Sequence, residues 1–278
     1  SSGDSSFKYL QNIYSNNDIN NQAVTIALGL SELFLEGHGV SRVHGGGFAG
    51  TIQAFVENNY VQEYKKKIEE GLSLQKYFPY KLIEWEVFLF ALIVGVFKTD
   101  GDIFFKEVRI VVGRGSGKNG FISFLSFYFL SPYHGIKGYN IDLLANTENQ
   151  AKTTFNDVYE IIKEPVNKSF ENILKKNFHA TKTEITGIKT KSVLRFNTSS
   201  KRGKDSKRTG CVIYDEKHEY EDTTNVNTLA SGLGKVWHGR EITITTNGHV
   251  RGGLLDRELD QNKDILKEYN SLNRTLVF

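Results

Sequence analysis

A glycine-rich segment near the middle of the chain has the composition of a loop that binds phosphate. Its residues are Gly113-Arg114-Gly115-Ser116-Gly117-Lys118-Asn119. Backbone N–H groups of such a turn, with the N-terminus of a following helix, can surround the phosphates of a nucleotide. Lys118 would then contact the β- and γ-phosphates. Two positions depart from the strict pattern, because Val112 stands where the first glycine belongs and Asn119 replaces the usual Mg²⁺-ligating Ser or Thr. The alternative is a glycine-rich turn with an exposed lysine.

Two adjacent carboxylates follow a later apolar stretch. Residues 210–214 have the pattern of a buried strand and lead into Asp215 and Glu216. In a parallel sheet, the carboxyl end of that strand is expected beside the phosphate loop. One carboxylate there can hold Mg²⁺ through water while the next polarises the attacking water. We therefore predict Asp215 as the metal ligand and Glu216 as the catalytic base. The alternative is a strand that ends in a charged turn.

A third strand also ends in polar groups. Residues 242–246 are followed by Asn247 and Gly248. Hydroxyl and amide groups at this position can sense the γ-phosphate and transmit its loss to neighbouring loops. Ordinary turn chemistry would also explain an Asn-Gly pair.

A basic segment precedes the carboxylate strand. Its charged residues are Lys201, Arg202, Lys204, Lys207 and Arg208. Such a segment could hold a phosphate backbone, or supply an arginine to the ATP of a neighbouring subunit. A solvated loop is the alternative.

Strands and helices alternate around these motifs. The predicted strands are 106–112, 139–145, 192–197, 210–214 and 241–246, and the predicted helices are 81–97, 121–130, 147–162, 223–232 and 254–269. This alternation predicts a parallel α/β sheet with both faces covered by helices. Residues 1–70 read as a small α+β piece, with helices over 7–14, 21–35 and 60–70 and a strand over Thr51–Val56.

The composition restricts the class of protein. Lys and Arg number 35 against 32 Asp and Glu, a net charge of +3 that excludes a polybasic and an acidic disordered protein. One cysteine excludes an intramolecular disulfide framework, and no paired spacing of Cys and His indicates zinc. No apolar run is long enough to span a membrane. We therefore expect a soluble intracellular protein. We also expect a fragment, because the chain begins with Ser and contains no Met.

Residues from about 78 to 278 resemble the ATPase domain of the large terminase subunit of tailed bacteriophages. The resemblance rests on the segments 113–118, 212–219 and 245–248. It implies an ASCE-type P-loop NTPase fold and the hydrolysis of ATP, with Mg²⁺, to drive DNA packaging. It further implies that Arg114 contacts phosphate, that Thr246 and Asn247 couple hydrolysis to movement, and that Trp85 lies in an adenine-contacting segment. An arginine acting in trans is expected, either Arg202 or Arg208.

The same resemblance implies the partners. These are double-stranded DNA, a homo-oligomeric ring on the capsid portal, and the small terminase subunit, in the cytoplasm of a bacterial host. The nuclease domain of the family is expected to be absent, so no DNA cleavage is expected from these residues.

Residues 1–70 resemble the C-terminal end of bacterial galactokinase. The similarity lies in residues 5–12 and in a glycine motif that includes Gly45, Gly46 and Gly47. The segments that carry the family's catalytic groups are missing, so sugar-kinase activity is not expected. We divide the chain into a galactokinase-like segment (1–71), a seam (72–80) and a terminase-like ATPase domain (81–278). The alternatives to a packaging ATPase are a galactokinase remnant and an inert hybrid fragment.

Overall fold

The computed structural model describes residues 39–44, 51–56, 58–98, 100–145, 147–198, 208–216, 232–246, 254–267 and 274–278. The chain forms two compact units, one of Ser1–Lys66 with Val96–Gly101 and the other of Lys67–Gly95 with Asp102–Phe278. The predicted domain division with a seam at 72–80 stays a prediction.

The first unit contains an antiparallel strand pair. Strands β1 (Gly39–His44) and β2 (Thr51–Val56) pair with Gly39 opposite Val56. The predicted strand over Thr51–Val56 is confirmed, whereas β1 was not predicted. Helix α2 (Asn58–Leu72) is longer than the predicted 60–70. Its residues from Lys67 on, and the 3₁₀ turn η2 (Ser73–Tyr77) that follows, belong to the second unit. The predicted helices at 7–14 and 21–35 and the motif Gly45, Gly46 and Gly47 lie outside the described residues.

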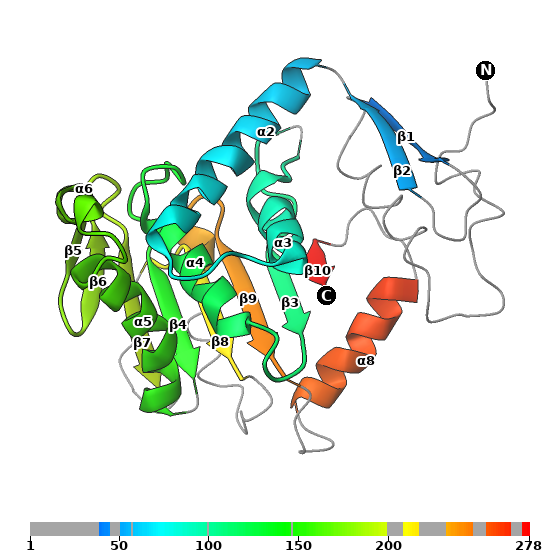
Figure 1. The fold of residues 1–278 in the computed structure, drawn as a ribbon. Helices are drawn as coiled ribbons and strands as arrows, with labels where there is room; N and C mark the ends of the chain where they lie inside the picture. Colours follow the sequence, from blue (N-terminus) through cyan, green and yellow to red (C-terminus); the bar gives the residue numbers. More distant parts are fainter. Residues whose placement is uncertain are drawn as a thin grey trace. The chain divides into compact units, whose positions relative to one another are not determined.

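The second unit is built on an eight-stranded sheet with the order β10-β3-β9-β8-β4-β7-β6-β5 (Figure 1). All neighbours from β10 to β7 are parallel, and β6 and β5 are added antiparallel. The strands are β3 (Glu107–Val111), β4 (Ile141–Ala145), β5 (Phe178–Ala180), β6 (Glu184–Gly187), β7 (Val193–Thr198), β8 (Cys211–Asp215), β9 (Arg240–Thr245) and β10 (Thr275–Val277). The fold is therefore a mostly parallel α/β sheet, as predicted.

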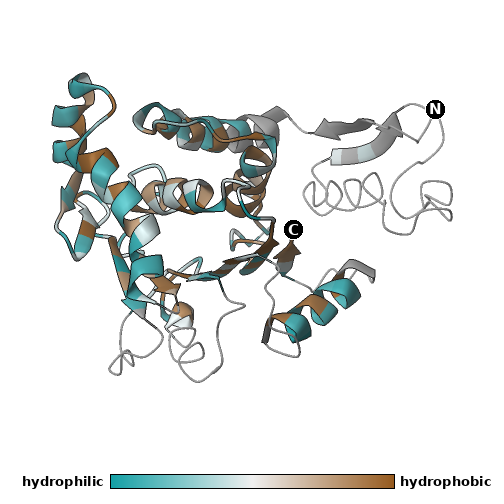
Figure 2. Ribbon diagram, turned by 60° about the horizontal axis from the view of Figure 1, so that its bottom comes forward, coloured by the Kyte–Doolittle hydropathy of each residue, from teal (hydrophilic) through white to brown (hydrophobic). Residues whose placement is uncertain are grey.

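The helices of this unit follow the apolar pattern of the sequence. They are α3 (Glu84–Gly95), α4 (Lys118–Leu130), α5 (Glu148–Lys163), α6 (Glu171–Asn177) and α8 (Leu254–Lys267), with 3₁₀ turns η3 (Lys168–Phe170) and η5 (Leu233–Lys235). Helices α4 and α5 lie on one face of the sheet (Figure 1). Every residue of α4 from Phe121 to Leu130 is buried. The central strands are mainly apolar, whereas α8 has both a polar and an apolar side (Figure 2). No described helix is long and apolar enough to cross a bilayer.

A buried arginine fixes two helices to the sheet. Arg240, the first residue of β9, is 2% exposed. Its guanidinium donates to the carbonyl oxygen of Ile93 in α3 at 2.7 Å and lies 5.2 Å from the ring centre of Phe129 in α4. Arg240 lies at the amino end of β9, and Ile93 and Phe129 lie near the C-terminal ends of their helices. The contact therefore helps to fix β9, α3 and α4 relative to one another.

Several elements differ from the sequence prediction. Helix α4 begins at Lys118 rather than 121, and α3 covers only Glu84–Gly95 of the predicted 81–97. Strands β5, β6 and β10 and helix α6 were not predicted, because three to seven residues give too short a periodic signal. The predicted helix 223–232 lies outside the described residues except Gly232, which is in a turn.

Candidate active site

The glycine-rich loop connects β3 to the first residue of α4. Gly115 and Gly117 have φ values of +77° and +93°, which side chains other than that of glycine rarely adopt. Gly117 is the N-cap of α4, and its carbonyl accepts the N–H of Phe121 at 3.1 Å. The segment therefore has the strand, loop and helix order that the phosphate-loop prediction requires, and Gly115 and Gly117 occupy positions that favour glycine.

Lys118 brings the loop and the two carboxylates together. Its Nζ lies 3.3 Å from Oδ1 of Asp215 and also donates to Oε1 of Glu216. All three side chains are largely buried, with exposed fractions of 12%, 14% and 18%. Strand β8, which carries the carboxylates, is not the neighbour of β3, because β9 lies between them. The long lysine side chain spans the intervening strand.

Glu216 has an unusual backbone conformation and a second partner. Its φ is +51°, and its N–H donates to the carbonyl of Ile244 at 3.0 Å. Its Oε2 accepts from both the N–H and the Oγ1 of Thr246, each at 3.3 Å. Such left-handed residues are strained and are often found where a side chain must be aimed. The end of β9 therefore holds the Glu216 carboxylate directly.

Burial affects the charge of Asp215. Desolvation raises the pKa of the Asp215 carboxyl, the Lys118 ammonium lowers it, and the neighbouring Glu216 raises it again. The net shift is upward. A buried carboxylate of this kind favours a cation beside it, which here is the Lys118 ammonium.

The donor set fits Mg²⁺ bound together with a nucleotide. Mg²⁺ is usually held by one or two carboxylates together with substrate phosphates and water. Asp215 provides one such carboxylate, and no group of three or more His, Cys, Asp or Glu in the described residues forms a metal site without a nucleotide. The buried hydroxyl of Ser116, within the loop, has no hydrogen-bond partner among the described residues. That hydroxyl is available to a ligand in the loop.

Helix α3 contributes residues that were predicted in part. The Trp85 ring lies 5.6 Å from the rings of both Phe121 and Phe278, and it is nearly parallel to the latter. Glu86, whose role was not predicted, is 4% exposed, and its Oε2 accepts the N–H of Ile83 at 2.8 Å. A carboxylate three residues after a helix N-cap is the sequence signal that could have found this contact. Burial raises the pKa of the Glu86 carboxyl.

Of the remaining predicted residues, Arg114 belongs to the loop and Asn119 to the first turn of α4, and the others lie apart from the cluster or outside the described residues. Arg114 is exposed, and the carbonyl of Asn119 accepts from Ser123 Oγ at 2.8 Å. Arg208 is exposed before the amino end of β8, at the end of that strand opposite Asp215. The structure therefore does not bring Arg208 to the Lys118 cluster of its own chain. Arg202 and Asn247 lie outside the described residues.

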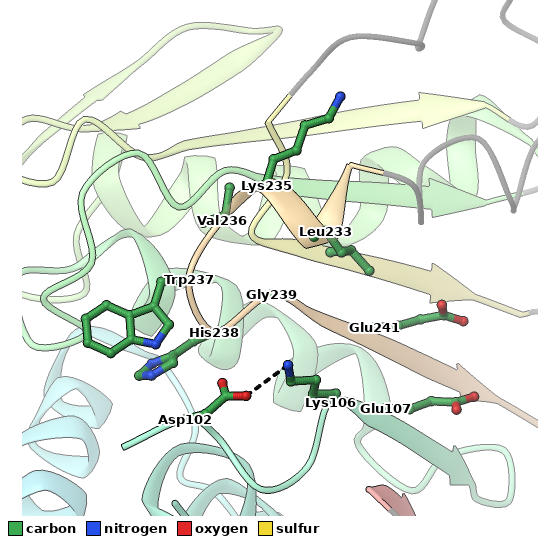
Figure 3. A pocket seen from close by; sticks show the side chains of 11 residues that line it. Asp102, Lys106, Glu107, Leu233, Lys235, Val236, Trp237, His238, Gly239 and Glu241 are labelled. Atoms are coloured by element: carbon green, nitrogen blue, oxygen red, sulfur yellow. Dashed lines mark ion pairs between the residues drawn. The ribbon is translucent and has the colours of Figure 1, made fainter. Parts of the chain in front are cut away.

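A separate cavity of about 610 Å³ lies at the amino ends of β3 and β9. Trp237, Lys106 and Glu241 are among its lining residues (Figure 3). None of the predicted site residues lines it, so this cavity is separate from the Lys118 cluster.

We expect Thr246→Val to slow turnover while leaving nucleotide binding intact. The substitution removes the hydroxyl donor to Glu216 Oε2 but keeps the backbone donor. Loss of one hydrogen bond to a charged group costs about 1.5–3 kcal/mol, so kcat should fall roughly tenfold or more. Steady-state kinetics should show a larger change in kcat than in KM. Thr246→Ser, which keeps the hydroxyl, should restore most of the rate, and equal rates in wild type and Thr246→Val would contradict the contact's role.

Comparison with known proteins places the chain in a family. Residues 84–264, more than half of the chain, match the family described as terminase large subunit, ATPase domain. The match does not extend to residues 1–70, so the galactokinase resemblance stays a prediction. No functionally curated protein matches the chain.

One solved structure shares the fold, and two others align with the chain less well. The large terminase of bacteriophage HK97 aligns with a TM-score of 0.62 at 16% identity, over 76% of this chain and 43% of that protein. The ATPase domain of the Thermus phage P74-26 large terminase aligns at 0.46 and 16% identity, over 66% and 76% of the two chains. The UvsW helicase of bacteriophage T4 aligns at 0.43 and 13% identity, over 77% and 67%. The chain thus spans less than half the length of the HK97 protein.

Proposed function

Because the chain belongs to the family of terminase large subunit ATPase domains, we propose that it hydrolyses ATP with Mg²⁺ to drive double-stranded DNA into a phage capsid. The observation that carries this proposal is the position of Lys118. Lys118 directly follows the glycine-rich loop, and its ammonium contacts the carboxylates of Asp215 and Glu216. Phosphoryl transfer needs a cation on the transferred phosphate and a base for water, and this cluster contains both.

Each residue of the cluster has a distinct role in the proposal. The backbone of 113–117 and the start of α4 bind the phosphates, and Lys118 neutralises charge that develops on the γ-phosphate. Asp215 holds Mg²⁺, which when bound neutralises the β- and γ-phosphate oxygens. Glu216 accepts a proton from the attacking water. Lys118 must move from Glu216 to the nucleotide, which releases the Glu216 carboxylate for this task.

The coupling role belongs to the end of β9. Thr246 contacts Glu216 directly and is followed by Asn247, so a change at the γ-phosphate can reach the segment after β9. Arg114 is proposed to contact phosphate, and Trp85 to flank the base. Arg202 or Arg208 is proposed to act on the nucleotide of a neighbouring subunit. The exposed position of Arg208, away from its own cluster, is compatible with a role in trans.

The partners are proposed at the level of the family. They are duplex DNA, a homo-oligomeric ring at the capsid portal and the small terminase subunit, in the host cytoplasm. The nuclease activity of a whole large terminase is not proposed for these residues.

The proposed function is tested by measuring phosphate release from ATP by the 278-residue chain. Release should require Mg²⁺, stop with EDTA and increase with duplex DNA. Absence of hydrolysis together with absence of ATP binding would overturn the proposal. Release of ADP that depends on galactose and survives Lys118→Ala would support the galactokinase alternative instead.

A further inference from the structure

Lysines are concentrated in the part of the chain that forms the antiparallel edge of the sheet. Residues 163–191 contain seven lysines and three glutamates, a net charge of +4, whereas the whole chain has only +3. This segment runs from the end of α5 through η3, α6, β5 and β6 to the turn before β7 (Figure 1). These residues and the basic segment at 201–208 each carry a net positive charge that the rest of the chain offsets.

Backbone hydrogen bonds bring four of the chain's lysines around one turn. The turn follows β6 and contains Lys189 and Lys191. The N–H of Ile188 donates to the carbonyl of Asn177 at 2.8 Å, which places the end of α6, with Lys176, beside the turn. The N–H of Gly138 donates to the carbonyl of Thr190, also at 2.8 Å, which adds Lys137. We call Lys137, Lys176, Lys189 and Lys191 the amino-edge lysine cluster.

The cluster lies at the amino ends of the parallel strands, whereas the candidate active site lies at their carboxyl ends. The turn precedes β7, and Lys137 precedes β4, so both are at the amino ends of parallel strands. Asp215 and Thr246 are at the carboxyl ends of their strands. The turn is nevertheless joined to the site by one buried helix. Thr190 Oγ1 donates to the carbonyl of Leu130, the last residue of α4, at 2.9 Å, and the first residue of α4 is Lys118.

The charge of the cluster is not neutralised within the described part of the chain. All four lysines are exposed, and none forms an ion pair with another described residue. Two of the three glutamates of the segment already have partners, since Glu171 pairs with Lys175 and Glu184 pairs with Arg195. A polyanion approaching these turns would meet four exposed ammonium groups.

One lysine of the cluster has a backbone conformation that glycine adopts at a lower cost in free energy. Lys191 has a φ of +59°, in the left-handed region. This conformation costs an L-residue about 1–2 kcal/mol relative to glycine. A lysine at this position therefore costs stability, and residues in strained conformations cluster at sites that bind ligands.

We propose that the amino-edge lysine cluster contacts the phosphate backbone of double-stranded DNA. The proposal rests on the proposed function and adds to it the surface of this chain that meets DNA. Ammonium groups on short turns bind phosphates without reading sequence, as a motor that moves along any DNA requires. Helix α4 then connects the DNA contact at one of its ends to Lys118 at the other.

The test compares two double variants that remove the same charge. Lys176→Ala with Lys189→Ala removes half of the cluster. Lys168→Ala with Lys182→Ala removes two exposed lysines of the same segment that lie away from the turn, before α6 and between β5 and β6. Binding of a short mixed-sequence DNA duplex is measured by fluorescence anisotropy across a salt series. The cluster variant should bind roughly tenfold or more weakly near 0.1 M salt, with the slope of log K against log salt reduced by about two. The control variant, Lys168→Ala with Lys182→Ala, should keep nearly the DNA affinity and the salt slope of wild type.

The Lys191→Gly variant separates binding from folding. It removes a charge and relieves the left-handed strain, so its thermal stability should equal or exceed that of wild type while its DNA affinity falls. Equal losses in both double variants, an unchanged slope in the cluster variant, or no DNA binding by wild type would overturn the proposal. ATP binding and DNA-independent hydrolysis, measured on the same preparations, should be unchanged in all these variants. If wild type neither binds nor hydrolyses ATP, that result would instead count against the proposed function.

Discussion

The Glu216→Gln variant is expected to bind Mg-ATP normally and to hydrolyse it about 10²–10⁴ times more slowly than wild type. Glutamine keeps the shape of the side chain and can still accept a hydrogen bond from Thr246, which now donates to Glu216 Oε2. It cannot take a proton from the attacking water. Lys118 keeps its contact with Asp215, so the phosphate loop should retain its charge.

Single-turnover ADP formation, with nucleotide affinity measured separately, distinguishes lost chemistry from lost binding. Glu184→Gln is the matched control, because Glu184 is a surface carboxylate paired with Arg195 and should not affect the rate. Normal turnover by Glu216→Gln would remove Glu216 from the role of base. Loss of ATP binding by this variant would mean that Glu216 maintains the structure of the site instead.

The Gly117→Ala variant is expected to lose both stability and nucleotide affinity. Alanine at φ +93° is strained, and its Cβ would lie 2.7 Å from Oε1 of Glu86. That carboxylate cannot move freely, since its other oxygen accepts the N–H of Ile83. Strain and overpacking together should lower the free energy of unfolding by about 1–3 kcal/mol. Because Gly117 precedes Lys118, displacement of the start of α4 should weaken ATP binding by about tenfold or more.

Gly113→Ala provides the control for this substitution. Gly113 belongs to the same loop, but it has no left-handed φ, and a Cβ there would meet nothing within 4 Å. Thermal denaturation and ATP titration of both variants should show a large effect for Gly117 and a small one for Gly113. Similar behaviour of the two variants would mean that the conformation at Gly117 is not what the loop depends on.

The sequence allowed the central strands to be predicted because each is an apolar run that ends in polar residues. The predicted strands at 106–112, 210–214 and 241–246 differ from β3, β8 and β9 by no more than one residue at either end. Their common parallel direction also follows from the alternation with helices. The residues expected at their carboxyl ends, Lys118 and the Asp215–Glu216 pair, do meet in the structure.

The lateral order of the strands could not be predicted. Nothing in the local sequence indicates that β9 lies between β3 and β8, because neighbours in a sheet are chosen by packing over the whole domain. The contact between Thr246 and Glu216 depends on that order, and so does the left-handed conformation of Glu216. For the same reason, the gathering of Lys137, Lys176 and the 189–191 turn was invisible in the sequence. These lysines become neighbours only through backbone bonds between separate elements.

The most direct test of the account is the release of ADP from Mg-ATP by wild type and by Lys118→Ala, each with and without duplex DNA. Removing Lys118 takes away the cation expected on the phosphates and the ion-pair partner of both Asp215 and Glu216. We predict hydrolysis by wild type, faster in the presence of DNA, and none above background by the variant in either condition. Hydrolysis by Lys118→Ala at the rate of wild type would contradict the central claim that this loop and these carboxylates form the ATPase site.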